Sequence, residues 1–340
     1  MTKVITSVIV ITAGLFMASY LIGFSPSKNL ELESKFEGFI NEYTPIYTTD
    51  AEYDYRLGVF AENMKIAEEL QESNPMAKFG ITPFSDRTPE EMQQMMGLSQ
   101  ELQDDLDQEQ QQVSKSNWLV ERWFRKSHDL TKSKNWKDHF HPVQNQKQCG
   151  SCWAFATTAV LEAHRSIKGL GKDKLSEQQL VDCEPATHGC NGGISAYAYG
   201  WYKDHDACSS NDYHYIGLQG ACKTDRCSSL GVHDEVHGAG WVKSGEPGIL
   251  DRIQNHGPVT VSIDATIWNT YQSGIMSQGC YKKGINHEVV VTGFKAQHSS
   301  PHYIIRNSWS ESWGEQGTIR ILYGKGVCGI HKQSFYPVLN

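Results

Sequence analysis

The chain has 340 residues, of which 39% are apolar and 21% are charged, and its formal net charge is −8. This composition excludes disordered, collagen-like and multi-span membrane proteins, and the negative balance excludes a strong basic field for nucleic acid. The nine cysteines are an odd number. Complete pairing of the others therefore leaves one thiol over.

The charge is distributed unevenly along the chain. Residues 1–126 carry 11 Lys/Arg and 20 Asp/Glu, whereas residues 127–340 carry 20 and 19. All nine cysteines and all 14 histidines lie in the second segment. At roughly 150 residues per domain, the length predicts two units, and the composition predicts that they have different roles.

The N-terminus contains a long uncharged stretch. Residues 4–24 carry no charge and lie between Lys3 and Lys28, which is typical of a secretory signal. The stretch is also long enough to span a bilayer, so an uncleaved membrane anchor stays open as the alternative. Either form of residues 1–27 delivers the chain to an oxidising compartment, where disulfides persist.

The acidic front segment has helical spacing over residues 29–73. Four residues that recur every three or four positions share one helix face: Glu52, Arg56, Phe60 and Asn63. A short helix is expected after Thr88, with Pro89 at its first position and Glu91 closing a capping box. Residues 99–112 lack apolar periodicity, which predicts a solvated linker accessible to proteases.

The run from Val143 to Phe155 contains the strongest signal for chemistry. It is followed by an Ala-rich amphipathic stretch that Gly169 ends, so Cys152 is expected at the start of a helix. The helix dipole and the free N–H groups there favour a thiolate, which is the nucleophilic form of cysteine. The alternative for any one cysteine here is half of a disulfide.

A thiolate nucleophile needs a base and a group that orients the base. His287 stands at the start of a predicted strand, before an apolar run, and Asn307 stands at the end of the run Tyr303–Ile305. Other histidines lie mostly among polar loop residues. His287 stands out in combination with Cys152 and Asn307.

This combination resembles the papain family of cysteine peptidases, whose signature is C-G-[SA]-C-[WY] with His and Asn about 130–150 residues downstream. Here His287 and Asn307 follow Cys152 by 135 and 155 positions. Further matches lie at 189–193, 307–309, 313–314 and 334–337. The front segment resembles the inhibitory pro-region of the cathepsin L-like branch, in the helix motif above and at Gly80, Thr82, Phe84 and Asp86.

The resemblance implies a fold and a division into segments. The fold is α+β and two-lobed, with a helical lobe, a β-barrel-like lobe and a mostly helical inhibitory pro-region before them. The segments are a signal or anchor, the pro-region, a linker that is cleaved on activation, and the peptidase domain: 1–27, 28–98, 99–126 and 127–340.

The resemblance also implies a role for each catalytic position. Cys152 attacks the peptide carbonyl, His287 protonates the leaving amine, and Asn307 fixes the imidazole ring. Gln146 and the backbone N–H of Cys152 form the oxyanion hole. Three further residues shield the site or bind the substrate backbone: Trp309, Gly192 and Gly193.

The specificity pocket is assigned by the same resemblance. Gln333 aligns with the floor of the pocket for the second residue before the cleaved bond, and Ile194, Ser262 and Ile285 line its walls. A Gln floor is expected to accept polar or basic side chains as well as Leu or Phe.

Spacing cannot choose the disulfides, because eight cysteines allow 105 pairings. The family pattern implies three pairs: Cys149–Cys190, Cys183–Cys222 and Cys280–Cys328. The remaining Cys208 and Cys227 are paired as a hypothesis, and Cys152 then stays single.

The chain departs from the family pattern at several positions without losing a catalytic group: Ala67, Gln71, Asn135, Glu288 and Ser310. The Glu288 carboxylate is expected to point away from His287, since adjacent residues of a strand face opposite sides.

The charge partition predicts an acid-activated zymogen. As pH falls toward about 4–5, carboxylates lose charge and histidines gain it. Pairings such as one made by Asp86 then weaken, and self-cleavage is expected within residues 115–133. The alternative is that the charge partition has no functional meaning.

The sequence therefore predicts an acid-active cysteine endopeptidase. Exopeptidase activity is less expected, because no obvious insertion would cap the cleft. A non-catalytic binding protein and a peptide ligase or acyl transferase stay as alternatives. Expected partners are protein and peptide substrates and the chain's own pro-region, and the resemblance also implies cystatin-type inhibitors. The protein is expected to be a monomer that contacts a membrane only through an uncleaved anchor. The expected location is lysosomal, endosomal or extracellular. No metal or cofactor is expected, since no separate ligand cluster or phosphate loop appears.

Overall fold

The computed structural model describes residues 26–99, 101–104, 130–280, 284–297 and 299–340. The chain forms two compact units, one up to Ala61 and one from Glu62. In the first, helix α2 (Pro26–Tyr43) and the first half of α3 (Asp50–Ser73) follow the predicted helical pattern. Their shared core is aromatic: the ring centroids of Phe36 and Phe60 lie 5.2 Å apart.

The second unit begins with the end of α3 and a short irregular stretch. Asn63 donates hydrogen bonds to the carbonyls of Ser85 and Arg87, both at 2.9 Å, and so holds the turn at residues 83–86 against the helix. Strand β1 (Ala77–Phe79) and helix α4 (Pro89–Gln93) follow. The predicted capping box is present at the start of α4.

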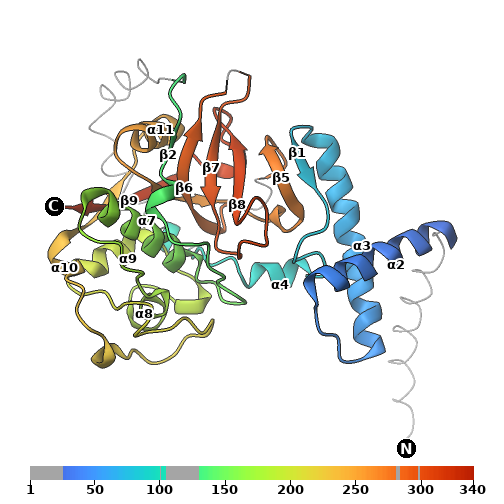
Figure 1. The fold of residues 1–340 in the computed structure, drawn as a ribbon, viewed down its shortest axis with the longest axis horizontal. Coiled ribbons are helices and arrows are strands. Elements are labelled where there is room, and N and C mark those ends of the chain that lie inside the picture. Colours follow the sequence, from blue (N-terminus) through green and yellow to red (C-terminus); the bar gives the residue numbers. More distant parts are fainter. Residues whose placement is uncertain (1–25, 100, 105–129, 281–283, 298) are drawn as a thin grey trace, which may run out of the picture. The chain divides into compact units, whose positions relative to one another are not determined.

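Three helices build one lobe of the second unit, and they lie together in the green part of the ribbon in Figure 1: α7 (Cys152–Lys168), α8 (Glu177–Cys183) and α9 (Ser195–Tyr202). Helix α7 begins at Cys152 and ends where Gly169 adopts a left-handed conformation, as the sequence predicts. Its buried face packs on Leu180 and Tyr199.

The other lobe is a sheet whose strands run β1-β5-β8-β7-β6-β4-β9-β3, with β2 paired to β6. Beyond β1 the strands are β2 (Lys134–Asn135), β3 (Val236–Trp241), β4 (Val259–Ile263), β5 (Tyr271–Met276), β6 (His287–Lys295), β7 (His302–Arg306), β8 (Thr318–Leu322) and β9 (Gln333–Leu339). Helices α10 (Val232–Glu235) and α11 (Gly245–Asn255) accompany them. Five single 3₁₀ turns lie in the loops of the described residues: 137–139, 189–191, 224–226, 268–270 and 327–329.

Strand β6 separates the two hydrophobic cores. Val289 and Val291 belong to the core of the sheet lobe, whereas Val290 belongs to the core that contains Trp153 of α7. This alternation follows from the pleat of a strand that is buried on both faces. The same pleat puts His287 and Glu288, at the start of β6, on opposite faces.

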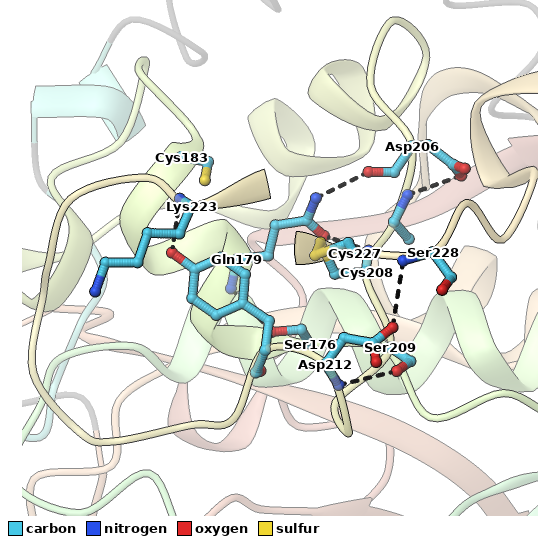
Figure 2. The surroundings of a disulfide bond; sticks show 12 residues. Ser176, Gln179, Cys183, Asp206, Cys208, Ser209, Asp212, Lys223, Cys227 and Ser228 are labelled. Carbon is cyan, nitrogen blue, oxygen red and sulfur yellow. Dashed lines mark hydrogen bonds between the residues drawn. A yellow bond between two sulfur atoms is a disulfide. The ribbon is translucent and has the colours of Figure 1, made fainter. Parts of the chain in front are cut away.

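The structure joins the cysteines in the pairs that the sequence suggested, and Cys152 is the free thiol: Cys149–Cys190, Cys183–Cys222, Cys208–Cys227 and Cys280–Cys328. Figure 2 shows the pair that the family pattern does not supply. Gln179 of α8 accepts from the backbone of Cys208 at 2.7 Å and donates to the carbonyl of Asp206 at 2.9 Å.

Gln179 also takes part at the start of α8. Ser176 caps α8 by accepting from the backbone of Gln179. The Gln179 side chain does not complete a capping box, because it is bound to the Cys208 loop. One correction concerns the linker: residues 101–104 are helical, and Leu102 and Gln103 are buried whereas Glu101 and Asp104 are exposed, so this part of the linker is only partly solvated. Residues 105–129 lie outside the described ranges.

Candidate active site

Cys152 lies at the N-terminus of α7 and is fully buried. The backbone N–H of Glu288 donates to its sulfur at 3.4 Å. Burial raises the pKa of Cys152 to about 12, although the N–H groups of Glu288, Gly97 and Trp153 act in the opposite direction. The thiolate predicted from the helix start is therefore not the favoured form while the sulfur is covered, because desolvation outweighs the helix terminus.

His287 and Asn307 lie together beside this sulfur, at the start of β6 and just after the end of β7. His287 Nε2 and Asn307 Oδ1 are 2.8 Å apart, so the amide fixes the ring as the resemblance implies. The other ring nitrogen, Nδ1, has no hydrogen-bond partner among the described residues. Burial lowers the pKa of His287 to about 4, and the bond to Asn307 offsets this only in part.

Trp309 covers the imidazole. Its ring centroid lies 5.1 Å from that of His287, and its side chain is completely buried. The indole rings of Trp268 and Trp313 pack against it in turn. Water is thus kept from the face of the histidine, which is the shielding role expected of Trp309.

Gln146 is held with its amide N–H₂ group facing the pro-region. Its Nε2 donates to the carbonyl of Met95 at 2.8 Å and to that of Cys149 at 2.9 Å, while its Oε1 accepts from Ser308 Oγ at 2.6 Å. The role of Ser308 was missed from the sequence, where it appears only as the middle residue of Asn307-Ser308-Trp309. No sequence signal pointed to Met95.

Residues 95–98 pass directly over the nucleophile. Leu98 forms a parallel bridge with Gly193, and Gly193 N donates to Gly97 O at 3.0 Å. Leu98 N donates to Asn286 O, next to His287, at 3.2 Å. The pro-region therefore uses the backbone groups that the resemblance assigned to substrate.

Glycines make this close approach possible. A Cβ atom on Gly97 would lie 1.8 Å from the carbonyl oxygen of Gly150, and one on Gly192 would lie 3.2 Å from that of Gly97. A Cβ on Gly193 would lie 2.6 Å from the Trp153 ring. The wall of the cleft at Gly192 and Gly193 is therefore low because the chain has no room for side chains there.

Of the residues assigned to the specificity pocket, Ile194 directly follows Gly193 in the chain. Ile194, Ser262 and Gln333 are buried, and Ile285 is half-buried. Ser262 of β4 is paired directly with Gln333 of β9 on one side and with Glu288 of β6 on the other. The pocket residues assigned from the sequence did not include Glu288.

The Glu288 side chain points away from His287, as expected from the alternation of a strand. Its carboxylate accepts from the backbone N–H of Ser195 at 2.9 Å and from the Ser195 hydroxyl. The contact joins β6 to the start of α9, so it connects the two lobes.

The described residues hold no group of three or more His, Cys, Asp or Glu side chains placed to bind a metal ion. No helix within the same ranges has both the length and the apolar character needed to cross a bilayer. The uncharged stretch 4–24, and with it the signal or anchor, lies outside these ranges.

Comparison with known proteins gives two family matches. Residues 126–338 match the papain family cysteine protease model, and residues 36–92 match the cathepsin propeptide inhibitor domain. The chain is 33% identical over 322 residues to cysteine proteinase 15A of Pisum sativum, covering 88% of this chain and 85% of that protein. It is 30% identical to cysteine proteinase A of Leishmania mexicana over 92% of this chain and 86% of that one.

Solved structures agree with this assignment. Digestive procathepsin L 3 of Tenebrio molitor superposes with a TM-score of 0.72 at 25% identity, covering 91% of this chain and 99% of that one. The recombinant stem bromelain precursor gives 0.74 at 27% identity, with 91% and 99% covered. Four disulfides and the family match indicate the secretory pathway. The chain belongs to the papain family of cysteine proteases, and it is a zymogen that carries its own inhibitory pro-region.

Proposed function

We propose that the mature protein is an endopeptidase. The observation that carries this proposal is the continuous backbone of residues 95–98, which runs past Gln146, Cys152 and Gly193 without a chain terminus. A site that binds backbone on both sides of the nucleophile accepts the interior of a peptide.

The chemistry follows from the groups that the departing pro-region exposes. The Cys152 sulfur gives its proton to His287 and attacks the carbonyl carbon of the substrate. The oxyanion forms where Gln146 Nε2 donates, in place of the Met95 carbonyl. His287 returns the proton to the leaving amine, and the thioester on Cys152 remains. Water then adds to the thioester and releases the acid, with His287 as base.

Acid activation is proposed on the same geometry. Under the pro-region, His287 has a pKa of about 4, below its ordinary value of about 6.5. An uncovered His287 takes up a proton between these values, so falling pH favours the open form in this window.

Incubation of the purified proenzyme at about pH 4.5 and about pH 7.5 tests this proposal. Processing within residues 115–133 is expected only at the acidic pH, and not at all in a Cys152→Ala protein. Equal processing at both pH values, or processing of the Cys152→Ala protein alone, would contradict it. Asp86, named above as a candidate switch, forms an ion pair with Arg87 inside the pro-region at 3.5 Å, and its part in activation stays a prediction.

Transfer to an amine in place of water is the second candidate, because both acceptors attack the same thioester. A non-catalytic binding protein is the third. Mass analysis of the products from one peptide separates them: two hydrolytic fragments support the peptidase, a joined product the ligase, and intact peptide the binding protein. We propose segment boundaries at 27, 98 and 126, a monomer inhibited by cystatin-type proteins, and a lysosomal, endosomal or extracellular location.

A Gln333 floor is proposed to admit polar or basic side chains as well as Leu or Phe at the second residue before the cleaved bond. The burial of Gln333 beside Ser262 supports a polar floor. A peptide-library profile with a strict aliphatic preference would contradict this.

A further inference from the structure

A row of three polar side chains crosses three neighbouring strands of the sheet. Glu288 of β6 is paired with Ser262 of β4, and Ser262 is paired with Gln333 of β9. Directly opposed residues on neighbouring strands present their side chains on the same face. That face is turned toward the helical lobe, since Val290 and Phe335, two positions further along, belong to its core.

The Glu288 carboxylate is buried there without a cation. It accepts from the backbone N–H of Ser195 at 2.9 Å and from the Ser195 hydroxyl, and Thr260 also hydrogen-bonds to it. No Lys, Arg or His forms an ion pair with it among the residues described. Buried carboxylates are ordinarily paired with an opposite charge, so this one lacks the partner that such groups have.

A second polar group in the row also lacks a partner. The hydroxyl of Ser262 is completely buried and forms no hydrogen bond within the described part of the chain. Unpaired buried hydroxyls are costly. A ligand group with several N–H donors would satisfy this oxygen and the carboxylate together.

The row lies where a substrate side chain arrives. Leu98 of the pro-region pairs with Gly193, and its side chain packs against the core that contains Ile194. Leu98 itself is only partly buried. A substrate strand at this position presents the side chain of its second residue before the cleaved bond to Ile194 and to the row beyond.

We propose that Glu288 is a specificity-determining residue that makes the mature enzyme select Arg or Lys at this position. The inference rests on the proposed peptidase function and goes beyond the polar floor assigned to Gln333. A cationic side chain supplies the missing counter-charge, and a guanidinium also offers donors to the Ser262 hydroxyl.

The selection should depend on pH with a definite sign. Burial raises the pKa of Glu288 to about 7, and the hydrogen bonds from Ser195 and Thr260 only partly offset this. Three further titratable groups lie around it on packed elements: Cys152 of α7, Tyr199 of α9 and His287 of β6. As pH rises through about 7, Glu288 ionises and the preference for a cation should grow.

The test compares fluorogenic dipeptides that carry Arg or citrulline at this position, since citrulline has nearly the same shape and no charge. For the activated wild type, the kcat/KM ratio of Arg to citrulline should reach about tenfold near pH 7.5, the scale of one charge pair. Near pH 5, where Glu288 is protonated, this ratio should fall to within about threefold of one.

In the Glu288→Gln variant, the Arg-to-citrulline ratio of kcat/KM should stay within about twofold of one at every pH, while the citrulline substrate is still cleaved. Glu246→Gln is the matched control: it removes another buried carboxylate, bound to Gly324 and Gly326, and should keep the wild-type ratio. Should Glu288→Gln fail to fold, the wild-type pH dependence of the ratio still decides.

A wild-type ratio near one at all pH values would overturn the inference, as would a preference for Ala or Gly, which would mean that Glu288 only fills the space. Absence of hydrolysis of every substrate, with Cys152 unreactive toward a thiol trap, would instead overturn the proposed function.

Discussion

The side-chain amide of Gln146 donates a hydrogen bond to the carbonyl oxygen of Met95 across 2.8 Å. A peptide carbonyl of the pro-region thus occupies the donor that we assign to the oxyanion. The backbone of Gly97 faces the sulfur of Cys152 at the same time. Inhibition and catalysis therefore depend on the same polar groups, and the zymogen is silent because its own chain already occupies them.

Gln146→Ala should lower kcat of the activated enzyme by about 10²–10³-fold, because a preorganised oxyanion donor acts mainly in the transition state. KM should change much less, since the ground-state carbonyl gains little from this donor. Steady-state kinetics on one fluorogenic peptide measure both. Gln144→Ala serves as the control, because the Gln144 side-chain amide donates to the nearby Pro142 carbonyl. A loss confined to KM would contradict the assignment.

Gly97→Ala should release the inhibition in the intact zymogen. The added Cβ would lie 1.8 Å from the carbonyl oxygen of Gly150, so the segment over Cys152 must move away. Labelling of Cys152 by a thiol trap at neutral pH should become at least about tenfold faster. This corresponds to a loss of about 1.4 kcal/mol from the free energy that favours the closed pro-region. Gly58→Ala is the matched control, because nothing lies within 4 Å of its Cβ position. Equal rates in both variants would show that the contact does not hold the segment closed.

Closure of the pro-region should weaken as pH falls from about 6.5 to about 4. His287 is neutral when covered, with a pKa of about 4, and regains its ordinary pKa when uncovered. The open form therefore binds the extra proton. Each unit by which pH falls within this window lowers the free energy that favours the closed form by up to about 1.4 kcal/mol.

Hydrogen exchange of residues 94–99 in a Cys152→Ala zymogen measures this closure. Protection, corrected for the intrinsic effect of pH, should fall across the window, and His287→Gln should flatten the dependence. Protection that stays constant in the parent protein would remove His287 from the switch.

Replacement of both Cys208 and Cys227 by Ser should lower the free energy of unfolding by about 3 kcal/mol, the value for a loop of this size. The two positions are 19 residues apart. Urea unfolding on the Cys152→Ala background measures the change without thiol exchange, and the single Cys152→Ala protein is the reference. Hydrolysis by the same double variant with Cys152 intact should stay within about twofold. An unchanged unfolding midpoint would mean that Gln179 and its neighbours hold the loop without the disulfide.

Local signals in the sequence predicted the elements that carry the site. The cap at Thr88, the helix start at Cys152 and the strand start at His287 each depend on a few adjacent residues, and each is present. The alternation along β6 also predicted on which side Glu288 lies.

Contacts between distant segments were not predictable in this way. The bond between Gln146 and Met95 joins residues 51 positions apart, and that between Ser195 and Glu288 joins residues 93 apart. Neither pair has a spacing or composition that marks it. The thiol form of Cys152 was missed for a related reason: the helix start is a local feature, but desolvation comes from the whole fold around it.

The account depends most on Cys152 as the nucleophile. The most direct measurement is peptide mapping by mass spectrometry after the acid-activated enzyme reacts with an epoxide that traps cysteine thiols. The account predicts one label, on Cys152, with activity lost in proportion to labelling and no label on a His287→Ala enzyme under the same conditions. Full activity with Cys152 completely labelled, or Cys152 found in a disulfide of the unreduced protein, would contradict it.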